Sequence, residues 1–386
     1  MTDKLHLTRQ RKRLGILCAI AIIAVLIATL WPFDFFPLNR VSWLPEGNGI
    51  RFGGAGLVVT KAPLMAGGTE ASKSCSLEIF LRPTSIKFVY TILSFYVPNN
   101  PRQFLVRQYT DGLLVSHDFV DPLNKLKTTK FDVDHAFEQG KLLLLTMTSG
   151  PNGTVVYLDG SKTQVVSRFT ISESNLAGQM VMGTSAAYYE PWPGEIRGLA
   201  IYSKELAPAE VLRHYRDWTD GGRVDPGDLD GAVARYAFTE GAGRDIHNAV
   251  VSGPDLEIPK RFRVPHKAFL RSPAREFEAS WDYVQHLSWN IAGFVPLGFI
   301  VCAYLAWTRN RWQAILYASL VGGILSFMIE VLQAYIPQRD SGTTDIITNT
   351  LGAALGAVLA RPSVVRMILG RTKSIAAYGN SVSRQD

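Results

Sequence analysis

Hydrophobic residues are concentrated in four long runs, one near the N-terminus and three near the C-terminus. The runs cover residues 15–35, 287–307, 314–336 and 345–360. At 1.5 Å per residue, each is long enough for roughly 30 Å of hydrocarbon, the last one only just. The pattern therefore predicts four transmembrane helices, one before and three after a long intervening segment.

Residues 38–260 show a different pattern, in which short alternating segments are separated by turn residues. Strands are predicted at residues 76–82, 141–146, 154–158 and 195–201. Asn152-Gly153 and Asp159-Gly160 predict tight turns, because Asn, Asp and Gly tolerate positive φ. Many short strands at such intervals favour a two-sheet β-sandwich. The predicted fold is multidomain, with a four-helix transmembrane unit (one plus three) and an all-β domain inserted after the first helix.

Positive charge flanks these helices unevenly. Lys and Arg beside short loops stay on the cytoplasmic side of a membrane. Here basic residues lie before the first run, between the second and third runs, and after the fourth run. They are, in that order, Lys4, Arg9, Arg11, Lys12 and Arg13; Arg309 and Arg311; and Arg361, Arg366, Arg371 and Lys373. Both termini, residues 1–14 and 362–386, are therefore predicted to be cytoplasmic and the sandwich extracytoplasmic. The net charge of +7 arises largely from these flanks, which predicts contact with the lipid bilayer and no nucleic-acid partner.

Two segments allow more than one interpretation. The first run could be a cleaved signal peptide, but the bulky residues Trp31 to Phe36 follow it where cleavage needs small ones. These aromatic residues are typical of a membrane interface and favour a retained helix. Residues 261–281 form a basic connector, which is either a solvated linker or a contact with anionic headgroups.

Polar residues interrupt the C-terminal runs at spacings of three and four, which place them on single helix faces. Ionisable groups at membrane depth cost at least about 2.5 kcal/mol each by insertion scales, and they mark functional sites by default. One arginine between the third and fourth runs belongs with them. The set comprises Asp282, His286, Asn290, Ser326, Glu330, Gln333, Arg339, Asp345 and Asn349. These groups are predicted to converge just below the outer membrane surface.

Three roles are open for this set. Glu330, with Asp345 and His286 as further catalytic candidates, could act as a general acid or base on a polar headgroup. The other six residues could form a binding pocket for an anionic or glycosyl headgroup, with Arg339 supplying paired donors to phosphate. Alternatively, the whole set could serve only to fasten the helices together.

The same residues carry a resemblance to a known family. The segments 290–298, 326–333 and 345–352, together with Arg339, resemble the VanZ-like membrane family over residues 282–361. The resemblance implies a multi-pass protein of the cell envelope. Members of that family are associated with reduced susceptibility to teicoplanin, and their biochemical activity is not established.

A second resemblance covers most of the predicted sandwich. Residues 154–160, 192–202 and 206–215 resemble the closing half of a laminin-G or concanavalin-like jelly roll. Residues 234–243 resemble the opening strand of that fold but come late, so either late strands complete the sandwich or the strand order is permuted. The family implies glycan binding through stacked aromatic rings, unless these rings belong to the core; the candidates are Tyr188, Tyr189, Trp192 and Trp218. It also allows calcium at Asp159 or Glu195; no other metal or cofactor is expected.

The predicted function is that of an inner-membrane protein that binds or helps process a polysaccharide or lipid-linked glycan at the external face. One alternative is an intramembrane hydrolase or transferase acting on a polyprenyl or phospholipid headgroup. The sequence contains neither a GxSxG nor an HExxH motif for such an enzyme. Another alternative is a passive envelope scaffold, and the oligomeric state stays open.

Overall fold

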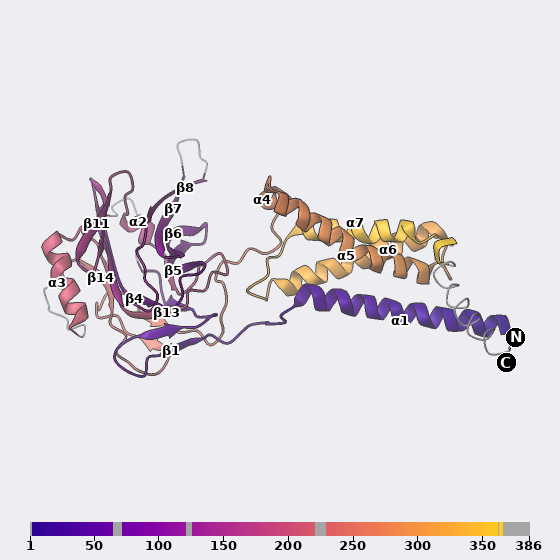
Figure 1. Ribbon diagram of the computed structural model, residues 1–386, viewed down its shortest axis with the longest axis horizontal. Helices are drawn as coiled ribbons and strands as arrows, with labels where there is room; N and C mark the ends of the chain where they lie inside the picture. The colour runs from indigo at the N-terminus through magenta and orange to yellow at the C-terminus, as the bar shows by residue number, and fades with distance from the viewer. Residues whose placement is uncertain (1, 65–71, 121–125, 221–228, 362, 366–386) are drawn as a thin grey trace, which may run out of the picture. The chain divides into compact units, whose positions relative to one another are not determined.

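The computed structural model describes residues 2–64, 72–120, 126–220, 229–361 and 363–365 (Figure 1). The chain forms two compact units. The β unit comprises Phe36–Lys267, and the helical unit comprises Met1–Phe35 with Ala268–Asp386. Residues 366–386, most of the predicted C-terminal tail, lie outside the described residues.

The β unit consists of two antiparallel sheets, as predicted. The first has the order β1 (Val41–Trp43), β2 (Ile50–Phe52), β13 (Gly194–Tyr202), β4 (Cys75–Pro83), β9 (Leu143–Gly150), β10 (Gly153–Leu158) and β11 (Ser161–Val166). The second has the order β15 (Asp245–Ile246), β16 (Leu256–Glu257), β3 (Val58–Thr60), β12 (Gln179–Met182), β5 (Val89–Val97), β6 (Asn100–Tyr109), β7 (Gly112–Val120) and β8 (Leu126–Val133). A short helix, α2 (Glu173–Leu176), precedes β12.

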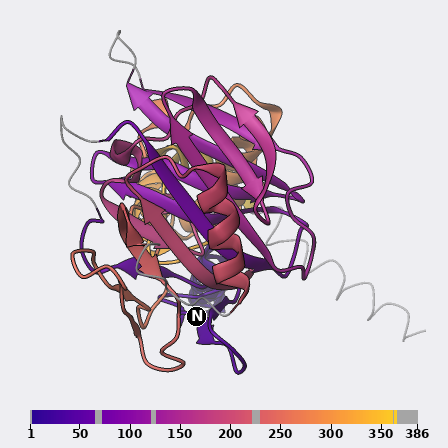
Figure 2. The ribbon, with the colours of Figure 1, turned by 90° about the vertical axis from the view of Figure 1, so that its left-hand side faces the viewer.

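The main core lies between the two sheets. Leu145 and Met147 of β9 face it from one side, and Phe95 and Phe104 face it from the other. Every residue of β9 is buried, although strands usually alternate between buried and exposed. The reason is a helix, α3 (Pro208–Thr219), which lies across the outer face of the first sheet and covers Leu144 (Figure 2).

Late strands complete both sheets, which answers the question of strand order. β14 (Ala232–Tyr236) pairs with β13 from Leu199 to Tyr202, beyond the part of β13 that pairs with β2. In the second sheet β16 pairs with β3, and β15 pairs with β16 and forms the edge. The segment that resembles an opening strand is therefore used as an added strand after the closing helix.

The predicted hairpins are present. Asp159 and Gly160 both have positive φ, 51° and 73°, and they join β10 to β11 in a two-residue turn. Gly153, with φ of 110°, begins β10 directly after the turn from β9. β9 itself begins two residues later than predicted, at Leu143. Local turn chemistry thus determines the register of these three strands.

The predicted basic connector is divided between the two units. Residues 261–267 belong to the β unit, where Phe262 is fully buried and Arg261 bridges to Leu38. The guanidinium of Arg261 also donates to the carbonyl oxygen of Phe36 (2.9 Å). The first part of the connector is therefore folded into the sandwich, and the interpretation as a solvated linker is wrong for residues 261–267. Residues 268–281 belong to the helical unit and include the short helix α4 (Pro273–Glu276).

The helical unit contains four long helices that run side by side (Figure 1). They are α1 (Thr2–Leu30), α5 (Trp281–Leu305), α6 (Arg311–Gln333) and α7 (Thr343–Leu359). Residues 10–30 of α1 and the whole of α5 and α6 are long and apolar enough to cross a membrane. The fourth predicted span, α7, has 17 residues, about 25 Å at 1.5 Å per residue, which is less than the hydrocarbon thickness.

Small residues allow α5 and α7 to touch backbone to backbone. A Cβ atom added to Gly298 would lie 1.9 Å from the carbonyl oxygen of Ala353. One added to Gly356 would lie 2.0 Å from the carbonyl oxygen of Val295, and one on Gly352 would lie 2.2 Å from that of Ile291. Gly352 and Gly356, a GxxxG pair, therefore form a packing face on α7.

Candidate functional site

The N-terminus of α7 is capped by carboxylates from two other segments. The Glu330 side chain, in α6 and 1% exposed, accepts a hydrogen bond from the backbone N–H of Gly342 (2.8 Å). Glu276 of α4 accepts from the backbone N–H of Thr344 (3.1 Å) and from its hydroxyl. The N-cap residue of α7 is Gly342. A side chain there would overlap Glu276, so glycine suits the site.

A second group of polar contacts joins α5, α6 and α7. Asn290 of α5 donates to the carboxylate of Asp345 on α7 (2.7 Å). Asn349 donates to the hydroxyl of Ser326 (2.9 Å), and that hydroxyl donates to the Asp345 carbonyl oxygen (3.4 Å). Ser326 and Asn349 are buried, so these bonds satisfy most of the polar groups that the apolar interior isolates.

Two more of the predicted residues hold the end of α1. The Gln333 amide donates to the carbonyl oxygen of Thr29 (3.0 Å). The Arg339 guanidinium donates two bonds to the carbonyl oxygen of Trp31, at 2.8 and 3.1 Å. The last carbonyls of a helix have no partner within it, so both contacts complete the C-terminus of α1.

These helix ends enclose a polar cavity of about 750 Å³ within the helical unit. It lies where α1 and α6 end and α5 and α7 begin. Six of the nine predicted residues line it: Asp282, His286, Asn290, Gln333, Arg339 and Asp345. Glu330, Ser326 and Asn349 are absent from the lining, because they are buried between the helices. The predicted set is thus divided into a cavity wall and a buried clasp.

Sequence reasoning missed several members of the wall. They are Arg271, Glu276, Glu278, Tyr283, Gln338 and Asp340. Arg271 forms an ion pair with Asp340 (2.7 Å). Most of these residues precede α5 or lie in the loop before α7, outside the hydrophobic runs in which helical spacing could be applied. The high density of charge around residues 271–282 was the available signal.

The charge of the cavity differs from our expectation. Its described lining carries five carboxyl groups, on Glu276, Glu278, Asp282, Asp340 and Asp345. The opposing charges are two guanidiniums, one paired with Asp340 and the other bonded to the Trp31 carbonyl. An excess of carboxylate repels phosphate, so the arrangement disfavours the predicted anionic headgroup. It favours hydroxyl groups or a cationic amine.

The four aromatic candidates of the β unit do not form one surface. Trp192 is fully buried between the sheets, and its indole N–H donates to Gln108 (2.8 Å). It is therefore a core residue, and its predicted glycan contact is wrong. Tyr188 and Tyr189 are half-buried, and the Tyr189 hydroxyl donates to the carbonyl oxygen of Gly54 (2.9 Å). Trp218, in the last turn of α3, is 3% exposed and packs on the other face of the first sheet.

The two residues named for calcium are already engaged. Asp159 accepts a hydrogen bond from the backbone N–H of Leu144 (2.9 Å) in the β10–β11 turn. Glu195 lies among three guanidiniums, those of Arg51 (2.7 Å), Arg82 (3.2 Å) and Arg197 (3.4 Å). Within the described ranges, no three His, Cys, Asp or Glu residues are grouped to hold a metal ion. The surroundings of Glu195 favour an anion over a cation.

Comparison with known families agrees with both resemblances. Residues 249–367 match the VanZ/LLP1 family. This VanZ-like region contains α5, α6, α7 and most of the cavity wall. Residues 53–212 match the concanavalin A-like lectin/glucanase superfamily, within the β unit. With three helices able to span a bilayer, the VanZ-like region identifies a membrane protein.

Several solved structures are similar to the chain. A native heptameric SAP-like pentraxin from Limulus polyphemus is 15% identical, with 58% of this chain and 93% of the pentraxin covered and a TM-score of 0.35. A putative carbohydrate binding protein from Bacteroides ovatus is 12% identical, with 56% and 61% covered and a TM-score of 0.37. The binding domain of botulinum neurotoxin DC, in complex with SialylT, is 16% identical, with 47% and 45% covered and a TM-score of 0.34. The chain covers less than two thirds of the length of the Bacteroides protein and of the neurotoxin domain. No curated protein matches it.

Proposed function

We propose that this protein is an inner-membrane protein of the cell envelope whose helical cavity binds the glycosyl or amine-bearing headgroup of a lipid, such as a lipid-linked glycan. In this proposal both termini are cytoplasmic, and the cavity and the β unit face outward. The observation that carries it is the polar cavity of about 750 Å³ at one end of an otherwise apolar helical unit. Polar groups are expensive at that depth and are retained where they meet a polar ligand.

The open groups of the wall support the choice of ligand. The side chains of Glu278 and Asp282 make no hydrogen bond or ion pair among the described residues, and both line the cavity beside His286. Carboxylates accept hydrogen bonds from sugar hydroxyls and attract amines. A phosphate or diphosphate group inside the cavity would meet uncompensated negative charge, so in this proposal the sugar or amine enters the cavity and the phosphate of the lipid stays outside it.

Binding is also better supported than hydrolysis or transfer. Glu330, the first of the three predicted acid or base candidates, does not line the cavity and already accepts the hydrogen bond from Gly342. Asp345 and His286 do line it, and the Asp345 carboxylate accepts from Asn290. A general acid or base must lie within hydrogen-bond reach of the reacting group. Any change in susceptibility to teicoplanin would, in this proposal, be a consequence of headgroup binding.

The test is the lipid that remains with the purified full-length protein. In mild detergent, we expect mass spectrometry to find a lipid with a sugar or amine headgroup bound to the wild type. Asp282→Asn combined with His286→Gln should lower its retention about tenfold, since hydrogen bonds to charged groups contribute about 1.5–3 kcal/mol.

The matched control is Asp34→Asn, in the same unit but outside the cavity wall, which should retain as much lipid as the wild type. Equal retention by the wild type and the double variant, with both folded, would remove the cavity from the proposed function.

A further inference from the structure

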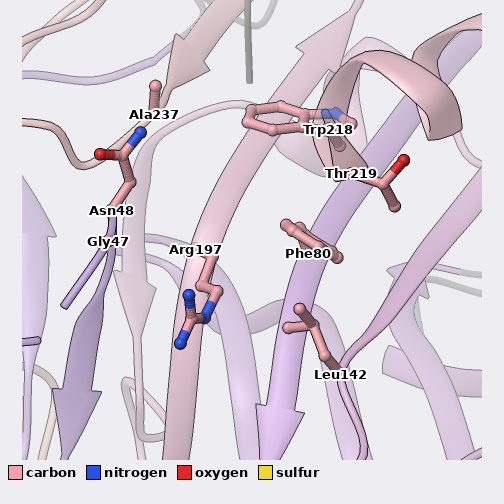
Figure 3. Close-up of a pocket in the computed structure, with 8 residues that line it drawn as sticks. All are labelled: Gly47, Asn48, Phe80, Leu142, Arg197, Trp218, Thr219 and Ala237. Atoms are coloured by element: carbon pink, nitrogen blue, oxygen red, sulfur yellow. The ribbon is translucent and has the colours of Figure 1, made fainter. Parts of the chain in front are cut away.

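A second hollow lies on the outer face of the first sheet in the β unit and has a volume of about 330 Å³ (Figure 3). Its walls come from distant parts of the chain. Arg197 stands on β13 beside Phe80 of β4, and Trp218 and Thr219 come from the end of α3. Asn48, between β1 and β2, also lines the hollow, and its amide lies beside Ala237 (Figure 3).

Glycine shapes this hollow at two points. A Cβ atom at Gly198 would lie 2.3 Å from the Trp218 ring, so the indole rests directly on the backbone of β13. Gly47, with φ of +71°, brings the β1–β2 loop over the guanidinium of Arg197. The resulting space is within the range of about 300–1,000 Å³ that is typical of ligand pockets.

Positive charge is in excess around Arg197, which lines the hollow, because Arg51 and Arg82 lie close to it outside the lining. Arg197, Arg51 and Arg82 surround one carboxylate, that of Glu195, which is 3% exposed. Burial raises the pKa of Glu195, but the Arg51 hydrogen bond and the three nearby charges outweigh it and lower the pKa below its ordinary value. This carboxylate therefore stays ionised, and the three guanidiniums exceed it by two charges. The Arg197 Nε atom is buried and has no hydrogen-bond partner.

A fourth guanidinium adds to this potential. Arg235 of β14 is fully buried, and its three side-chain nitrogens have no hydrogen-bond partner. It stacks on the Trp218 ring, 4.0 Å from the ring centroid. The nearby carboxylate of Glu78 is bonded instead to His214 (2.9 Å) and to the Trp218 indole N–H (3.0 Å). A desolvated cation without a counter-ion is costly, and an anion in the adjoining hollow would offset that cost.

We propose that this hollow binds a sugar residue that carries a carboxylate, a uronic acid unit of an acidic polysaccharide. The planar Arg197 guanidinium matches a carboxylate with two parallel donors. The Asn48 amide and the Thr219 hydroxyl are placed for sugar hydroxyls, and Phe80, Leu142 and Trp218 form an apolar wall for the C–H face of the ring. This site is separate from the helical cavity and from Tyr188, Tyr189 and Trp192.

The experiment is calorimetric titration of the full-length protein in detergent with a β-1,4-linked tetramer of glucuronic acid. The neutral β-1,4-linked glucose tetramer is the matched probe. We expect the acidic tetramer to bind about tenfold more tightly or better, and this preference to weaken as salt is raised. Arg197→Gln should remove the preference. The control Arg168→Gln, an exposed arginine of the same unit, should leave it unchanged.

Three results would overturn the proposal. They are equal binding of the two tetramers, an acidic preference that survives Arg197→Gln, and full competition by inorganic phosphate, which would indicate a general anion site without sugar recognition. If Arg197→Gln lowers the thermal midpoint of the β unit, Asn48→Ala replaces it, since Asn48 is half-exposed and its side chain supports no described contact; it should weaken the acidic tetramer severalfold. The helical variant Asp282→Asn with His286→Gln should bind the tetramer normally, so failure of one proposal is distinguishable from failure of the other.

Discussion

Replacement of Glu330 by alanine is expected to destabilise the helical unit by about 2–3 kcal/mol, because it leaves a buried backbone donor without a partner. The donor is the backbone N–H of Gly342, from which the Glu330 carboxylate accepts a hydrogen bond (2.8 Å). Water cannot replace the carboxylate, since Glu330 is 1% exposed.

The measurement is the free energy of unfolding of the full-length protein in detergent, followed by the circular dichroism of its helices. Glu330→Gln is the matched control, because its amide oxygen still accepts from Gly342 and we expect less than half of the loss. If both variants unfold like the wild type, Glu330 is not a cap. If Glu330→Gln is stable but abolishes a measured turnover, the catalytic interpretation regains its support.

Gly356→Ala is expected to cost about 2 kcal/mol or more, because the added methyl group cannot fit between α5 and α7. The new Cβ would lie 2.0 Å from the Val295 carbonyl oxygen and 2.9 Å from the Phe299 backbone nitrogen. Both are backbone atoms that cannot rotate away. The two helices must separate, and the Asn290–Asp345 hydrogen bond between them should weaken as well.

Gly293→Ala provides the control on an exposed face of α5, since its Cβ would meet no atom within 4 Å. Alanine favours helix over glycine by about 1 kcal/mol, so this variant should be neutral or slightly more stable. Thermal unfolding and lipid retention are measured on both variants. Equal stability of the two would show that the α5–α7 contact is looser than described.

The clasp and the cavity have a common origin in the short length of α7. With 17 residues, this helix begins below the end of its neighbours, and its first N–H groups need partners inside the unit. Glu330 of α6 and Glu276 of α4 supply these partners. The segments before α5 and before α7 form much of the cavity wall beside them. Polar residues in these helices therefore have two different roles at neighbouring positions.

Local sequence patterns predicted most elements of the fold. Hydrophobic run length located α5 and α6 to within six residues at each end and found α1, although α1 begins thirteen residues earlier than predicted. Alternation located β4, β10 and β13. Asp159-Gly160 predicted its turn because only a few residue types accept positive φ. Spacing of three and four correctly placed Asn290, Ser326 and Asp345 on faces that meet. Each of these features depends on residues that are only a few positions apart in the chain, so it can be predicted from the sequence.

The tertiary structure alone decided which partner each polar group has. Helical spacing could not separate Asp345, which lines the cavity, from Glu330, which lies behind it, because the distinction depends on where a remote segment ends. Nor could it show that Trp192 belongs to the core, or that Arg197, Trp218 and Asn48 border one hollow. The burial of a side chain and the electrostatic potential around it depend on segments that are far apart in the chain. The sequence by itself determined the membrane helices, the sandwich and the family of the C-terminal region, and the packing of those parts determined the candidate sites.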